Sequence, residues 1–124
     1  MKEVQHYLKD FQKEKNWDIP ESEFLETKMA ILNNYMLLTT EVSEVAEEFR
    51  GIFTKTKQLQ QSENLTEQEA FLRAKELHKE NIGKELADCI AYIMKFANYF
   101  EIDMEESFYN KMEEIQRRIY IERR

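Results

Sequence analysis

Two short segments of the sequence each place two carboxylates three residues apart: Glu41-Val-Ser-Glu44 and Glu85-Leu-Ala-Asp88. In an α-helix, residues three apart lie one turn apart on nearly the same face. With about 100° between successive residues, these acids border the apolar stripe of their helix instead of opposing it. If the two apolar stripes pack together, the four carboxylates meet where the helices touch.

Carboxylates that gather at a partly desolvated contact need a counter-charge, because burying unpaired anions is costly. Hard divalent cations prefer ligand sets made entirely of oxygen. The sequence therefore predicts a metal site formed by Glu41, Glu44, Glu85 and Asp88, with Mg²⁺ as the expected ion and Mn²⁺ as the alternative.

The composition predicts one all-helical domain covering residues 1–124. The chain is 42% hydrophobic and 35% charged, and it contains only two Gly and one Pro, which favours helix over turn-rich folds. A chain of this length builds one core more readily than two. We expect an all-α fold, a bundle of four to five helices.

The net charge of −7 argues against two classes of partner. Neither a nucleic-acid polymer nor an anionic membrane suits a chain without a basic face. The longest apolar run, Cys89 to Met94, is far too short to span a bilayer. We expect a cytoplasmic protein in which Cys89, the single cysteine, is a small core residue and not a nucleophile.

Apolar spacing and capping signals predict where the helices lie. A polar segment at 54–64 is predicted to be a linker, with Gly51 near the end of the helix before it, and Asn81–Gly83 is expected to break or bend the chain. Thr66 and Glu69 form a capping box that opens the helix after the linker. The expected helices cover 2–15, 24–53, a segment starting at Thr66, 84–100 and a last segment starting at Asp103.

The last predicted helix carries two cations on one side, Lys111 and Arg118, which lie seven residues apart. Two cations that face an acidic metal site can hold the oxygens of a phosphate whose other side is bound by the metal. This pair is a candidate phosphate clamp.

In the order of these features, the chain resembles the MazG-type family of all-α nucleoside triphosphate pyrophosphohydrolases. The family motif, E-x-x-E on one helix and E-x-x-D on a later one, is matched by residues 41–50 and 84–93, and a helix with a Lys and a downstream Arg follows. The resemblance implies hydrolysis of a nucleoside triphosphate to monophosphate and pyrophosphate. It implies that the four acids hold Mg²⁺ and that Lys111 and Arg118 stabilise the leaving pyrophosphate. Glu48, one turn from Glu44, is a further candidate that ranks below the four acids, either as the base or as a residue that supports the metal ligands.

Two features set this chain apart within the resemblance. The spacing of forty residues between Glu44 and Glu85 is longer than in compact family members, so the linker and helix at 54–82 are expected to be an insertion. Phe11-Gln-Lys-Glu-Lys-Asn-Trp17 is similar to an aromatic segment that stacks on the base in the dCTPase-like branch, but the distance from Trp17 to Glu41 does not match that branch. The sequence leaves the base of the substrate open.

A second hypothesis belongs to a different class: a catalytically silent, acidic helical module that dimerises and binds a partner protein. Taken singly, Glu residues at this spacing usually form a solvated helix face, and Lys111 and Arg118 are ordinary surface cations. Under the enzyme hypothesis we also expect a homodimer or homotetramer, because the predicted helix 24–53 has more apolar surface than three short helices can cover. Only the enzyme has a reason to bind Mg²⁺.

Overall fold

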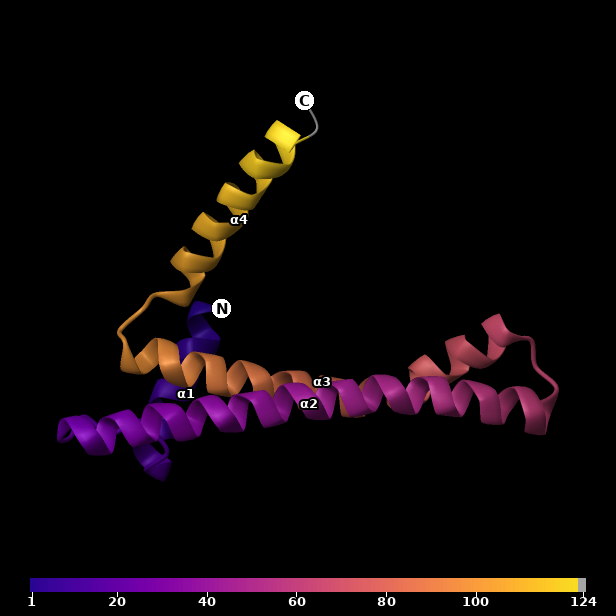
Figure 1. Cartoon of the computed structure of the whole chain (residues 1–124), viewed down its shortest axis with the longest axis horizontal. Helices are drawn as coiled ribbons and strands as arrows, with labels where there is room; N and C mark the ends of the chain where they lie inside the picture. Colours follow the sequence, from indigo (N-terminus) through magenta and orange to yellow (C-terminus); the bar gives the residue numbers. More distant parts are fainter. Residues whose placement is uncertain (123–124) are drawn as a thin grey trace. The chain divides into compact units, whose positions relative to one another are not determined.

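The computed structural model describes residues 1–122, and this part of the chain is entirely helical apart from its connections (Figure 1). No strand occurs within these residues, so the predicted all-α class is confirmed. Among the same residues, no helix is both long and apolar enough to cross a membrane. The four helices are α1 (Lys2–Lys15), α2 (Phe24–Glu63), α3 (Glu67–Tyr99) and α4 (Met104–Glu122).

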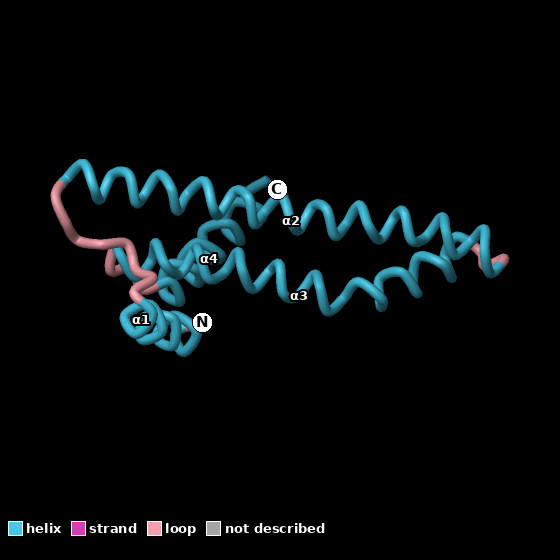
Figure 2. Tube along the Cα trace, turned by 90° about the horizontal axis from the view of Figure 1, so that it is seen from below, coloured by secondary structure: helices cyan, strands magenta, loops and turns pink. Residues whose placement is uncertain are grey.

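The chain divides into two compact units. The first unit combines Met1–Ile31 with the segment that starts at Ile93, and it holds α1, the end of α3 and α4. The second unit, Leu32–Tyr92, is a hairpin in which α2 and α3 run side by side in opposite directions (Figure 2). All four acids of the predicted metal site belong to this hairpin.

Helix α2 is ten residues longer than predicted. The segment 54–64 was expected to be a polar linker, but α2 continues without interruption to Glu63. Thr56 and Leu59 supply the buried positions there, and the Thr56 hydroxyl is satisfied by donating to the carbonyl of Ile52 at 2.7 Å. A buried threonine thus takes the place of an apolar residue in the helical pattern, and for that reason the linker prediction was wrong.

Helix α3 joins two segments that were predicted to be separate. It runs from Glu67 to Tyr99 without a break at Asn81–Gly83, so residues 54–82 are the continuation of α2, a short turn and the first half of α3. The predicted capping box is confirmed. The Thr66 amide donates to Glu69 Oε1 at 3.0 Å, and the Glu69 amide donates to Thr66 Oγ1 at 3.2 Å.

An apolar core near the turn holds the two arms of the hairpin together. Ala70 and Ala74 of α3 have no exposed surface, and side chains this small let the helices approach closely. The core consists of Ile52, Leu59, Ala70 and Ala74, with Leu65, Phe71 and Ile82 packed against it. This packing sets the register of α2 against α3, and so determines which acids face one another farther along the hairpin.

Gly51 lies inside α2 and gives room to a side chain of α3. A Cβ atom at Gly51 would lie 2.9 Å from Cε1 of His78, whereas a Cβ atom at Gly83 would meet nothing within 4 Å. We expect Gly83→Ala to stabilise the fold by about 1 kcal/mol through helix propensity. Gly51→Ala should be about 2 kcal/mol less favourable than Gly83→Ala, because it crowds a packed ring. Urea unfolding of the two variants measures this difference, and equal stabilities would contradict the packing role of Gly51.

The first unit is joined by contacts between α1 and α4 and by the side chain of Gln5. Its Nε2 donates to the carbonyl of Ile102 at 2.7 Å, and its Oε1 accepts from the amide of Met104 at 3.1 Å. Asp103 caps α4 as predicted, since its Oδ1 accepts from the amide of Glu106 at 3.1 Å. Gln5 therefore fixes the start of α4 against α1.

Candidate metal centre

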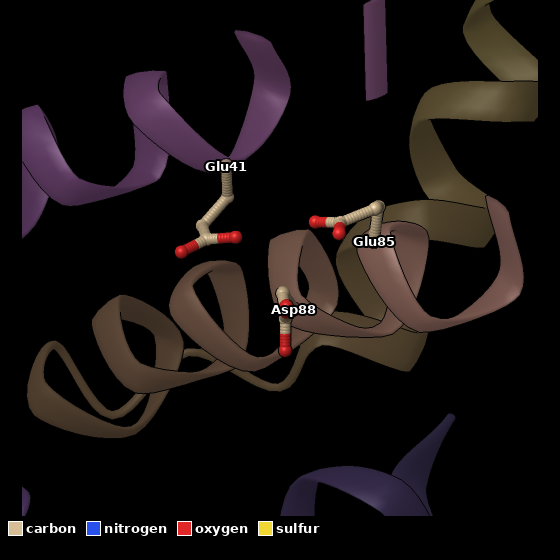
Figure 3. Close-up of side chains that lie close together, drawn as sticks. All are labelled: Glu41, Glu85 and Asp88. Atoms are coloured by element: carbon tan, nitrogen blue, oxygen red, sulfur yellow. The ribbon is translucent and has the colours of Figure 1, made fainter. Parts of the chain in front are cut away.

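Three of the four predicted metal ligands come together between the arms of the hairpin. Glu41 of α2 and Glu85 and Asp88 of α3 each offer a carboxylate oxygen, and these three oxygens lie within 4.8 Å of one another. Figure 3 shows Glu41 reaching from α2 towards α3, with the carboxylate of Glu85 turned towards it. Glu41 and Glu85 are partly buried, and Asp88 is exposed. The arrangement is an open, all-oxygen site that solvent and a ligand can reach.

The carboxylates of this trio disfavour one another's charge. Desolvation raises the pKa of Glu41, and the charges of Asp88, Glu85 and Glu44 raise it further, together with a hydrogen bond to Asp88. Desolvation likewise raises the pKa of Glu85, followed by the charges of Asp88, Glu44 and Glu48. Repulsion of this kind is relieved either by a proton or by a cation, which is the electrostatic condition that a divalent metal site requires.

The raised pKa values give the metal-free protein a defined pH dependence. A carboxyl whose pKa is higher in the folded state binds its proton more tightly when folded, so the contribution of Glu41 and Glu85 to the free energy of unfolding rises as the pH falls from 7 towards the ordinary value of 4.5. Glu41→Gln removes one of the repelling charges. We therefore expect it to stabilise the metal-free protein at pH 7, by an amount that shrinks as the pH falls. Urea unfolding in a chelator across this range measures the effect.

Glu76→Gln is the matched control, because Glu76 is an exposed acid on α3 and lies outside the carboxylate trio. A stability difference between Glu41→Gln and wild type that is the same at pH 5 and pH 7 would contradict the coupling described here.

Glu44, the fourth predicted ligand, is exposed and lies outside the close trio. Its charge still raises the pKa of both Glu41 and Glu85, so it lies near enough to act on them. The structure thus places Glu44 at the edge of the site as a fourth negative group.

A partly buried histidine of α3, His78, lies beside this site. His78 Nδ1 is 3.0 Å from Oε2 of Glu48, and both side chains are less than a quarter exposed. Glu48 in turn contributes to the raised pKa of Glu85, which links the pair electrostatically to the trio. Two signals in the sequence point to this pair: His78 lies seven residues before Glu85 and hence on the same face of α3, and Gly51 leaves space on α2.

The predicted phosphate clamp, Lys111 and Arg118, belongs to the first unit. Both side chains are exposed and bind the same carboxylate: Lys111 Nζ is 3.2 Å and Arg118 Nη2 is 3.3 Å from Glu114 Oε1. A hydrogen bond from Lys111 is the main cause of the lowered pKa of Glu114, and the charges of Lys111 and Arg118 add to it. The two cations thus share one side of α4, as predicted, and one carboxylate engages both.

Cys89 and Tyr92 lie on α3, and desolvation and negative charges from the carboxylate trio raise the pKa of both side chains. Desolvation raises the pKa of the Cys89 thiol, and Glu41, Asp88 and Glu85 raise it further. Desolvation, then Glu41 and Asp88, raise the pKa of Tyr92. Since a thiol with a raised pKa is a poor nucleophile at neutral pH, the environment of Cys89 favours a packing role, as expected from the sequence.

Comparison of the chain with protein-family models, with curated proteins and with solved structures found no match.

Proposed function

We propose that the protein is a Mg²⁺-dependent pyrophosphohydrolase that cleaves nucleoside triphosphates to monophosphate and pyrophosphate. The observation that supports this proposal is the meeting of Glu41, Glu85 and Asp88, whose oxygens lie within 4.8 Å of one another. The three acids come from two helices and from segments forty residues apart, and the order of the motifs is the one that resembles the MazG-type family.

The donor set fits a hard divalent cation, because all of its atoms are carboxylate oxygens and their charges repel one another in its absence. Glu41, Glu85 and Asp88 would hold the ion, and Glu44 would add negative charge at the edge. When bound, Mg²⁺ would neutralise negative charge on the triphosphate and lower the pKa of a water molecule. Mn²⁺ suits the same donor set.

Glu48 is the residue that we assign as proton acceptor. Its Oε2 is held by His78 Nδ1, so Oε1 is the atom that would take a proton from the attacking water. Attack of that water on the α-phosphorus breaks its bond to the bridging oxygen, and pyrophosphate leaves. His78 acts through Glu48 by fixing the orientation of the carboxylate, which makes it a positioning residue.

Lys111 and Arg118 would bind the charge that develops on the pyrophosphate. Each is now engaged by Glu114, a contact between exposed groups that is worth little. Pyrophosphate carries more negative charge than the Glu114 carboxylate, so it can displace Glu114 from Lys111 and Arg118.

A second candidate function, the silent interaction module, is favoured by one observation. α2 exposes a row of large apolar side chains within the hairpin, with exposed fractions from 46% to 62%: Tyr35, Val42, Phe49 and Phe53. Because about 100° separates successive residues, these four lie on one face of the helix. Such a face is also what a homodimer or homotetramer of the enzyme would cover.

An assay of pyrophosphate release distinguishes the two functions. Canonical, deoxy and damaged nucleoside triphosphates are incubated with the protein and Mg²⁺, and the products are separated by ion-exchange chromatography. The enzyme yields equal amounts of monophosphate and pyrophosphate from at least one substrate, and Glu44→Gln lowers the rate. Release of orthophosphate, or a slow rate for all substrates that Glu44→Gln leaves unchanged, would contradict the proposal.

A further inference from the structure

A cavity of about 400 Å³ lies in the first unit between α1, the loop after it and the end of α3. A volume of this size is typical of sites for small organic molecules. Its walls include two aliphatic or aromatic side chains and several polar ones, among them Lys9, Gln12, Asp18, Ile19, Lys95 and Tyr99. No residue of the carboxylate trio contributes to it, so the cavity is separate from the candidate metal centre.

A hydrogen-bond network fixes the orientation of Gln12, a wall residue that is only 2% exposed. Asn98 Nδ2 donates both to the carbonyl of Gln5 at 3.4 Å and to Gln12 Oε1 at 3.0 Å. Because a backbone carbonyl only accepts, the nitrogen of Asn98 must face this way, and Gln12 must present its oxygen to it. Gln12 Nε2 is then left as a buried donor, and it has no partner among the residues that the structure describes.

Lys95 brings a buried cation to the same cavity. It is 5% exposed, and its Nζ lies 3.9 Å from the centre of the Trp17 ring, a cation–π contact. Burial lowers the pKa of Lys95, and the charge of Asp18 opposes this. A buried amide donor and a buried ammonium together favour a ligand group that accepts hydrogen bonds and carries negative charge.

We propose that this cavity binds a small organic monocarboxylate, whose carboxylate accepts from Gln12 Nε2 and faces Lys95. The wall balances three acids, Asp18, Glu21 and Glu101, against three lysines, Lys9, Lys13 and Lys95. It therefore has no excess positive charge with which to bind phosphates or nucleoside triphosphates. Ile19 and Tyr99 offer an apolar surface for the rest of the molecule. This site is independent of the proposed hydrolase activity.

Titration of the full ¹⁵N-labelled chain with benzoate tests the proposal by NMR, with benzyl alcohol as the neutral analogue and inorganic phosphate as the multivalent anion. We expect benzoate to cause saturable chemical-shift changes of the Gln12 side-chain amide. The dissociation constant for benzoate should be at least ten times lower than that for either control ligand. In Gln12→Glu a carboxylate oxygen can still accept from Asn98 Nδ2 in place of Gln12 Oε1, so we expect the fold to be kept. That variant should bind benzoate at least tenfold more weakly, whereas Gln61→Glu, the same change at an exposed position of α2, should bind like wild type.

The wild-type titration decides the matter even if Gln12→Glu unfolds. Shifts that do not saturate by about 20 mM benzoate, where a millimolar site would be filled, would overturn the proposal. So would phosphate or benzyl alcohol binding as tightly as benzoate, or a folded Gln12→Glu variant with unchanged affinity.

Discussion

Replacing Asp88 by asparagine is expected to lower the rate of nucleoside triphosphate hydrolysis by at least about 100-fold, which corresponds to about 2.7 kcal/mol in the activation barrier. The amide has nearly the shape of the carboxylate but is a weaker ligand for a divalent cation. In the metal-free protein the same change removes one of the charges that raise the pKa of Glu41, so the fold should be kept or slightly stabilised. Steady-state kinetics and melting curves in a chelator measure the two effects.

Two other variants make the result specific. Glu76→Gln removes an exposed α3 charge outside the trio and should leave the rate unchanged. Lys111→Ala should weaken triphosphate binding or leaving-group stabilisation without changing the affinity for Mg²⁺. If Asp88→Asn unfolds the metal-free protein, or keeps near-normal activity at saturating Mg²⁺, then Asp88 is a structural residue and the proposed site is wrong.

The second large effect is expected from Phe53→Glu on self-association. Phe53 is 62% exposed and shares one face of α2 with Phe49 and Val42. If this face is covered by a second copy of the chain, a carboxylate at position 53, the last position of the apolar row, would be buried without a partner, at a cost of several kcal/mol. We expect the dissociation constant of the oligomer to rise by about 100-fold or more. Analytical ultracentrifugation across micromolar concentrations measures the change.

Lys57→Glu is the control for added negative charge, because Lys57 lies one turn farther along α2 and is exposed. Around the axis of α2, the residues that face α3 lie near 0–60°, Phe53 lies at about 120° and Lys57 lies at about 160°. Lys57 therefore lies on the side of the apolar row that is farther from α3, towards solvent. We expect a smaller effect there. A wild-type protein that is monomeric by light scattering at micromolar concentration would rule out the predicted oligomer.

Local signals predicted most of the helices correctly, and the errors fall where a local signal was overridden by packing. The capping box at Thr66 and Asp103 at the start of α4 needed only neighbouring residues, and both are confirmed. Gly51 was interpreted as a helix end, but it lies within α2 because His78 of the other arm occupies the space beside it. The local pattern does not show which distant side chain such a glycine makes room for.

The candidate site shows the same division. Spacing alone predicted that acids from the two helices would meet, and the structure brings Glu41, Glu85 and Asp88 together. The contact between Glu48 and His78 depends on the register of α2 against α3, which is set by the alanine-rich core near the turn. Composition and helical spacing do not determine that register, so this pair was missed.

The most direct test of the central claim is the melting temperature of the protein as a function of Mg²⁺ concentration at neutral pH. A ligand that binds only the folded state stabilises it by an amount that grows with concentration, about 2.7 kcal/mol at one hundred times its dissociation constant. We predict a rise in melting temperature at millimolar Mg²⁺ that is lost in Glu41→Gln and reduced in Glu44→Gln, but retained in Glu76→Gln. A melting temperature that Mg²⁺ does not change, or a rise that is the same in wild type and Glu41→Gln, would contradict a metal centre at these carboxylates.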